Sequence, residues 1–321
     1  MLALYASMVL CRLTTFVFWE DYNRLANLSF GVTTGHPLYR MWQSRVLGPY
    51  TIKAFTFGGL DYIRAHILFQ ILTVAIAAFL CWRLGRKYGG SDQSAVLAIT
   101  LFVVSFALLL SPTWLCSWDF LDIIVVILLI DLVLAGASLR WFIILFAIAI
   151  FNRDSALFIP LWLIIDPLVR FFYQRRSKLP AAPLDWGRML AGVVCIAAGF
   201  LMMELLRQSL LVEAIETANY YPFRVGYNIE LLKARYLDRT FTFVIPAFLA
   251  TVIALGACVV RHDPQRYLAL YLIVIAFMGL NFVFSIMDET RIYLFLIPFI
   301  VISAVLLLRP AQSPPKGVEC T

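Results

Sequence analysis

Several acidic side chains in this sequence lie where an apolar segment ends or begins, and their chemistry suits a reaction site. Glu20 and Asp21 follow the first apolar segment, and Asp119 and Asp122 begin another, three residues apart. A carboxylate can remove a proton from a hydroxyl or an amine as a general base. At the boundary of a membrane, these residues could activate an acceptor molecule for transfer.

Arginines accompany these acids. Arg153 stands in the polar segment NRDS and Arg291 in the segment DETR, each between two apolar runs. Asn152, Asp154 or Ser155 can cap the following helix, but a cation at a helix N-terminus opposes the helix dipole. Arg153 and Arg291 therefore need another partner. A guanidinium binds phosphate through two parallel hydrogen bonds, so a lipid phosphate is a suitable one, as are Asp119 and Asp122.

The remaining candidates have an ordinary interpretation as well as a functional one. Glu20 and Asp21 can be a polar flank that ends a helix, and Asp119 can be a first-turn acid that favours a helix N-terminus. Arg40 and Arg45 can bind phosphate, or can anchor an amphipathic helix to anionic lipid. They are five residues apart and would point about 140° apart on one helix, so the sequence leaves open which of them contacts a ligand.

The composition determines what kind of fold must position these residues. The chain is 62% hydrophobic and 14% charged, with a mean hydropathy of +0.88. A soluble domain needs about a quarter of its residues charged, so the sequence predicts an integral membrane protein. Its net charge is +7. In a membrane protein the distribution of the cations between the two sides of the membrane matters more than this sum, so the charge does not indicate nucleic-acid binding. The cysteines and histidines have no metal-ligand spacing, so no metal site is predicted from them.

The apolar runs predict ten membrane-spanning helices. Eight runs are long enough to cross about 30 Å of hydrocarbon. They lie at about 2–19, 66–83, 94–112, 118–136, 189–206, 240–260, 267–286 and 292–308. In 140–173, one helix would place Asn152, Arg153 and Asp154 near the middle of the membrane, which is costly. We therefore predict two helices that meet there at a polar turn.

Charge asymmetry supports this topology. With both termini cytoplasmic, the inner segments hold thirteen cations and five acids, whereas the outer segments hold twelve cations and thirteen acids. The predicted fold is an all-α polytopic transmembrane bundle, a single domain over 1–309, with a disordered cytoplasmic tail over 310–321. Arg12 and Asp131 lie inside helices, where each can pair or extend to the boundary.

Two outer loops, 20–65 and 207–239, are long enough to contain helices of their own. In the second, apolar residues recur at helical spacing in two places. The first set is Leu210, Leu211, Ala214, Ile215 and Ala218, and the second is Leu231, Leu232 and Tyr236. This spacing predicts short amphipathic helices that lie on the membrane surface.

The polar segments resemble those of the GT-C class of integral-membrane glycosyltransferases. They are Glu20 and Asp21 with YNRLANLSF after them, YRMWQSRVLGPY, SWDFLD, NRDSALFIPLW and DETRIYLFLIP. Members of that class use polyprenyl-phosphate-linked sugars on the extracytoplasmic or lumenal face, with an acid just after the first helix as general base. The acids of this first loop are adjacent and do not form the spaced Asp-x-Asp often found there.

The resemblance implies roles for the candidate residues. Asp21, or Glu20 in its place, would be the general base, and Arg153 and Arg291, with Arg40 or Arg45, would hold the lipid phosphate. Three acids would orient these arginines, position acceptor hydroxyls or hold a divalent metal, and they are Asp119, Asp122 and Glu289. Clustered carboxylates at water suit Mg²⁺ or Mn²⁺, but nothing in the sequence requires either ion as a cofactor.

The expected function is transfer of a sugar, on the periplasmic or outer face of a bacterial inner membrane, to a glycan, lipid or protein acceptor. Membrane lipids are the expected surroundings, and no nucleic acid is expected as a partner. One alternative is a polymerase or ligase of lipid-linked glycans, in which the loop arginines matter more than Asp21. Another is a flippase or transporter for such lipids, which needs a polar path through the bundle. The runs at 94–112, 240–260, 267–286 and 292–308 are free of charge through their middles and disfavour such a path. A structural membrane subunit is a further alternative.

Overall fold

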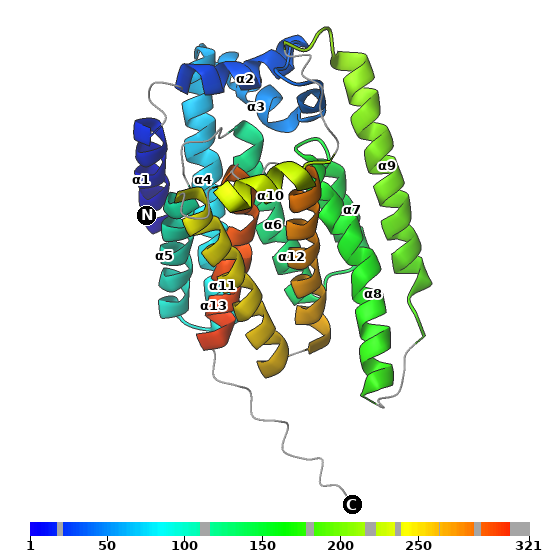
Figure 1. Ribbon diagram of the computed structural model, residues 1–321. Helices are drawn as coiled ribbons and strands as arrows, with labels where there is room; N and C mark the ends of the chain where they lie inside the picture. Colours follow the sequence, from blue (N-terminus) through cyan, green and yellow to red (C-terminus); the bar gives the residue numbers. More distant parts are fainter. Residues whose placement is uncertain are drawn as a thin grey trace, which may run out of the picture.

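The computed structural model describes residues 1–17, 22–109, 116–177, 183–215, 223–234, 239–262, 264–285 and 290–308. In these residues the chain forms α-helices and short 3-10 helices, without a strand, so the all-α prediction is confirmed for them (Figure 1). The predicted tail, 310–321, lies outside them. In chain order the elements are α1 (Leu2–Val17), α2 (Tyr22–Thr34), η1 (Arg40–Ser44), α3 (Leu47–Thr56), α4 (Tyr62–Gly89), α5 (Asp92–Leu109), α6 (Ser117–Ala135), α7 (Leu139–Ala149), η2 (Asp154–Leu157), α8 (Phe158–Arg176), α9 (Trp186–Leu210), α10 (Val225–Ala234), α11 (Arg239–Arg261), α12 (Pro264–Phe284), η3 (Thr290–Leu296) and α13 (Ile297–Leu308).

Each of the ten predicted apolar segments coincides with a helix. They are α1, α4 to α9 and α11 to α13, and the last is preceded by the 3-10 helix η3. Among the described residues, five helical segments are long and apolar enough to cross a membrane, namely α4, α5, α9, α12 and Asp154–Arg176, which joins η2 to α8. The chain therefore has the helices of an integral membrane protein.

The predicted interruption within 140–173 is confirmed. α7 ends at Ala149, residues 150–153 form a turn, and η2 leads into α8. The turn is not a free surface loop, because the Asn152 side chain is buried and its amide donates a hydrogen bond to the Trp118 carbonyl at 2.9 Å. The start of α6 thus accepts the side-chain N–H of the polar residue that interrupts the apolar run.

The first long loop folds into α2, η1 and α3, which lie together at the upper end of the bundle in Figure 1. The second loop contains α10, which includes Leu231 and Leu232, as their spacing predicts. The amphipathic helix predicted from Leu210 onward is wrong for residues 211–215, which are not helical. The N–H groups of Val212 and Ile215 bond instead to the carbonyls of Gly35 at 2.8 Å and Pro37 at 3.0 Å, in the first loop.

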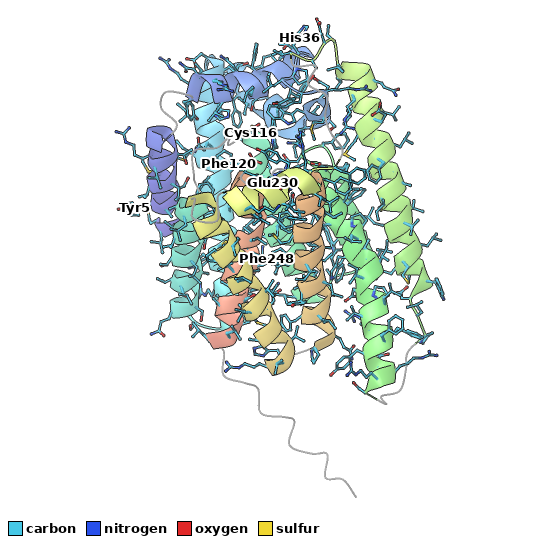
Figure 2. The ribbon with its side chains drawn as sticks, in the orientation of Figure 1. Tyr5, His36, Cys116, Phe120, Glu230 and Phe248 are labelled. Atoms are coloured by element: carbon cyan, nitrogen blue, oxygen red, sulfur yellow. The ribbon has the colours of Figure 1, made fainter. Side chains whose placement is uncertain are left out.

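α6 is the central helix of the bundle. It packs against α3, α4, α7 and α13, and more than half of its side chains are buried. Phe120 of α6 lies inside the bundle, whereas Tyr5 of α1 projects from its surface (Figure 2). By contrast, α9 packs mainly along α8 at the edge of the bundle and exposes much of its apolar surface (Figure 1). A residue at either end of α6 can therefore meet side chains from several other helices.

Candidate functional site

Asp119 connects the start of α6 to the turn that follows α7. One carboxylate oxygen, Oδ2, accepts the backbone N–H of Cys116 at 2.7 Å, which satisfies a donor at the N-terminus of α6. The other oxygen, Oδ1, accepts a hydrogen bond from the Arg153 guanidinium at 2.9 Å. The Asp119 side chain is 0% exposed. Asp119 therefore has both roles that the sequence offered for it: it favours the helix start and it orients an arginine.

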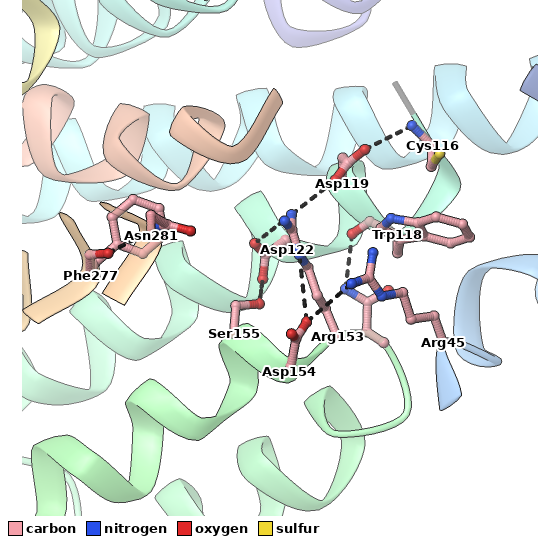
Figure 3. Close-up of polar contacts among 11 residues, drawn as sticks. Arg45, Cys116, Trp118, Asp119, Asp122, Arg153, Asp154, Ser155, Phe277 and Asn281 are labelled. Atoms are coloured by element: carbon pink, nitrogen blue, oxygen red, sulfur yellow. Dashed lines mark hydrogen bonds and ion pairs between the residues drawn. The ribbon is translucent and has the colours of Figure 1, made fainter. Parts of the chain in front are cut away.

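Arg153 lies at the centre of a group of carboxylates (Figure 3). In addition to Asp119, its guanidinium is 3.6 Å from Asp122 Oδ2 and 3.9 Å from Asp154 Oδ1. Only 12% of the Arg153 side chain is exposed, so its charge needs such partners. The cation that opposed the helix dipole in the sequence is thus paired with two acids of α6, among them Asp119.

Asp122 lies one turn deeper in α6 than Asp119, and it is nearly buried. Its Oδ1 accepts a hydrogen bond from the Ser155 hydroxyl, and its Oδ2 faces Arg153. Asp122 thus links α6 to the start of η2, as expected for an acid too deep in the helix to be a first-turn cap.

Arg45 is the arginine of the first loop that reaches this group. Its guanidinium contacts Asp154 Oδ1 at 3.4 Å and lies over the Trp118 ring, 5.3 Å from the ring centroid. A backbone hydrogen bond of 2.8 Å from the Leu47 N–H to the Phe151 carbonyl holds the same loop to the turn. Arg40 instead pairs with Glu204 of α9 at 3.0 Å, with 62% and 42% of the two side chains exposed. The geometry therefore favours Arg45 over Arg40 as a site residue.

These contacts define one site, which we call the outer-end cluster. Its members are Arg45, Asp119, Asp122, Arg153, Asp154 and Ser155. Two guanidiniums and three carboxylates leave a formal charge of −1. Asp154 is the exception to the burial of the charged members, with half of its side chain exposed, so the cluster meets the surface there. An incoming anion can replace Asp154 beside the two arginines more easily than it can replace a buried acid.

Several predicted site residues fall outside the part of the chain that the structure describes. They are Glu20, Asp21 and Glu289, together with the side chain of Arg291. The backbone of Arg291 belongs to η3, and η3 packs against α6. The element that carries Arg291 is therefore a neighbour of the helix that carries Asp119 and Asp122.

Sequence reasoning missed some members of the site. Asp154 and Ser155 were expected only as possible caps of the next helix, although both contact other members of the cluster. The Trp118 ring, which lies under the Arg45 guanidinium, was not predicted as a neighbour of the site.

Among the described residues, no group of three or more acids, histidines and cysteines is placed to hold a metal ion. Arg153 contacts both Asp119 and Asp122, so these carboxylates are already engaged with a cation. A role for Mg²⁺ or Mn²⁺ stays a prediction that gains no support from this geometry.

A second charged layer surrounds Asp131, further along α6. Its carboxylate contacts Lys87 Nζ at 2.6 Å, the Tyr88 hydroxyl at 2.8 Å and the Arg83 guanidinium at 3.6 Å. Asp131 therefore pairs, which was one of the two outcomes predicted for it. Asp131 lies nine positions beyond Asp122, which corresponds to about 14 Å of helix.

Comparisons of the chain with protein-family models, with curated proteins and with solved structures found no match. The interpretation of the outer-end cluster therefore rests on its own chemistry.

Proposed function

We propose that this chain is a membrane glycosyltransferase that moves a sugar from a polyprenyl-phosphate donor to an acceptor on the extracytoplasmic face. The observation that carries the proposal is the outer-end cluster, in which Arg45 of the first loop meets Arg153 and three carboxylates from α6 and η2. Charged groups at the ends of apolar helices lie at the depth of lipid phosphates.

The reaction needs two kinds of group. The acceptor oxygen attacks the sugar carbon that bears the phosphate, and the bond from that carbon to the phosphate oxygen breaks. The polyprenyl phosphate leaves with the bonding electrons, and a guanidinium stabilises its charge. The acceptor proton passes to a carboxylate, which we assign to Asp21, with Glu20 as the substitute.

Within the cluster, Asp119 and Asp122 hold Arg153 in place, and Asp154 is the exchangeable acid. Asp154 lies near both guanidiniums, at 3.4 Å from Arg45 and 3.9 Å from Arg153, and half of its side chain is exposed. We assign the donor phosphate to the position that Asp154 occupies, where it would contact both arginines. Removal of the Asp154 charge should therefore strengthen phosphate binding.

The proposal includes a topology of ten spans, with both termini cytoplasmic, in a bacterial inner membrane. The coincidence of ten predicted segments with helices supports this count, and the excess of cations in the inner segments supports the orientation. The loops that contain α2, η1, α3 and α10 would then face the periplasm, where lipid-linked sugars meet their acceptors.

Binding of undecaprenyl phosphate tests the site without knowledge of the sugar. We expect native mass spectrometry of the purified full chain to show this lipid retained by the wild type. Arg45→Gln should weaken retention about tenfold or more, because a charge-assisted contact of about 1.5–3 kcal/mol is lost. Arg40→Gln is the matched control from the same loop and should retain the lipid, and Asp154→Asn should retain it more strongly. Equal retention by the Arg45 and Arg40 variants would contradict the assignment.

Transfer itself is tested with radiolabelled undecaprenyl-phosphate-linked mannose, glucose and galactose in membrane vesicles that contain the protein. Asp21→Asn, at matched expression, should abolish transfer of label from the donor. If both Asp21→Asn and Glu20→Gln transfer normally and the Arg45 variant does not, the polymerase or ligase alternative is favoured. Movement of labelled lipid across the bilayer without release of polyprenyl phosphate would indicate the flippase alternative.

A further inference from the structure

A second set of arginines surrounds one buried carboxylate at the other end of the bundle. Asp166 of α8 has a fully buried side chain, which contacts Arg170 Nε at 3.0 Å and an Arg188 guanidinium nitrogen at 3.4 Å. Arg266 of α12 also interacts electrostatically with Asp166, and it donates to the Leu134 carbonyl near the end of α6 at 3.0 Å. Because Leu134 and Asp119 lie at opposite ends of α6, this set is remote from the outer-end cluster.

Two aromatic rings hold Arg188 in position. Its guanidinium lies 4.7 Å from the centroid of the Trp162 ring and 5.4 Å from that of Phe142, and these two rings stack at 4.5 Å. Attraction between a cation and a ring face, together with the ion pair to Asp166, fixes the charged group against α8. Arg188 is thus preorganised, and binding of a ligand would need little further ordering.

The charges of this set do not balance. Arg170 and Arg188 both contact the carboxylate of Asp166, and Arg266 interacts with it electrostatically. Asp185, the N-cap of α9, is a second acid beside Arg188. Among the described residues these three guanidiniums and two carboxylates leave a formal charge of +1. The Arg170 side chain is 42% exposed, so the excess charge reaches the surface. The outer-end cluster, by comparison, has an excess of negative charge.

We propose that Arg170 and Arg188 bind the phosphate group of an anionic phospholipid at the end of the α8–α9 helix pair. A guanidinium matches phosphate geometry, and basic groups at the ends of membrane helices bind anionic headgroups. α9 exposes much of its apolar surface, including Trp186 and Leu190 near its start, and this surface can hold the acyl chain. This favours a lipid over a free phosphate ion, and the proposal does not depend on the glycosyltransferase assignment.

The test is native mass spectrometry of the full chain with phosphatidylglycerol or phosphatidylcholine in detergent. We expect preferential retention of phosphatidylglycerol by the wild type, and Arg170→Gln should weaken it about fivefold. Asp166→Asn should strengthen retention of phosphatidylglycerol, because it removes a negative charge that competes with the lipid phosphate. If the ion pairs of Asp166 served only to stabilise the fold, both Arg170→Gln and Asp166→Asn would weaken retention. The matched control is Arg64→Gln, which also removes an exposed arginine that pairs with an acid close to it in sequence. This variant should retain phosphatidylglycerol as strongly as the wild type.

Three outcomes would overturn the proposal. They are equal retention of the two lipids, weaker phosphatidylglycerol binding in Asp166→Asn, and displacement of phosphatidylglycerol by millimolar inorganic phosphate. Failure of the donor-binding test at Arg45 would leave these expectations intact, so the two proposals fail separately.

Discussion

Asp119 and Asp61 both accept a backbone N–H at the start of a helix and both face an arginine, but they differ in burial. Asp61 accepts the Arg64 N–H at 2.8 Å and pairs with the Arg64 side chain at 3.1 Å, with 55% of its own side chain exposed. Asp119 makes the equivalent contacts with no exposure. An exposed pair contributes little because water solvates both partners, whereas loss of one buried partner leaves an uncompensated charge.

We therefore predict that Asp119→Ala lowers the free energy of unfolding by about 3–5 kcal/mol. Asp61→Ala should lower it by about 1 kcal/mol, the usual contribution of a helix cap. Denaturant titration of both variants in the same detergent measures the two values. Equal losses would contradict the view that burial makes Asp119 critical.

Several members of the outer-end cluster were candidates from the sequence, and local features explain which of their contacts could be expected. Arg153 was predictable because a cation at a helix N-terminus conflicts with the dipole, so a partner such as Asp119 could be inferred. The choice between Arg40 and Arg45 was not predictable, because η1 and the chain around it follow no long regular period. Asp154 and Ser155 had a sufficient explanation as caps, and that explanation hid their contacts with Arg45 and Asp122.

Helices were the most predictable elements, because a long apolar run in a membrane protein has little alternative to a helix. The prediction failed in 211–215, where apolar spacing suggested a helix but the backbone bonds to the first loop. Such pairing joins residues far apart in sequence, which a local periodicity cannot report. The tie also fixes the upper end of α9 to the loop that carries Arg40 and Arg45.

Gly35 is the position at which the hydrogen bonding between residues 211–215 and the first loop is most sensitive to substitution. It has φ of +78°, and a Cβ there would lie 2.7 Å from the Leu210 carbonyl oxygen. Gly35→Ala should therefore break the hydrogen bonds to Val212 and Glu213 and speed hydrogen exchange in 211–215. Gly59 has φ of +85°, and a Cβ there would meet no atom within 4 Å, so Gly59→Ala should cost only backbone strain of about 1 kcal/mol. Unchanged exchange in the Gly35 variant would show that the tie does not depend on this geometry.

The outer-end cluster and the arginines around Asp166 lie at opposite ends of a helical bundle whose longest apolar helices match the length of a membrane span. The distribution of cations predicts that the end with α2 and α3 faces outward. Charge asymmetry could predict this orientation because it acts on whole loops, and it needs no knowledge of side-chain contacts.

Insertion of an epitope tag at two comparable glycines tests the orientation. Gly59, after α3, and Gly136, after α6, are both exposed, have positive φ and have open space beside them. In spheroplasts with intact membranes, antibody should bind a tag inserted after Gly59 and should bind the tag after Gly136 only once the membrane is permeabilised. The reverse pattern would invert the topology and place the outer-end cluster in the cytoplasm.

The short distance along α6 between Asp122 and Asp131 has an electrical consequence. Residues 123–130 carry no charge and span about 12 Å, less than half of the roughly 30 Å hydrocarbon core around the protein. If water reaches both charged layers, the membrane voltage falls across this thinner insulator, and the field inside the protein becomes more than twice as steep as in the lipid. The free energy of moving an anionic headgroup from the Asp122 layer to the Asp131 layer would then depend strongly on the membrane voltage.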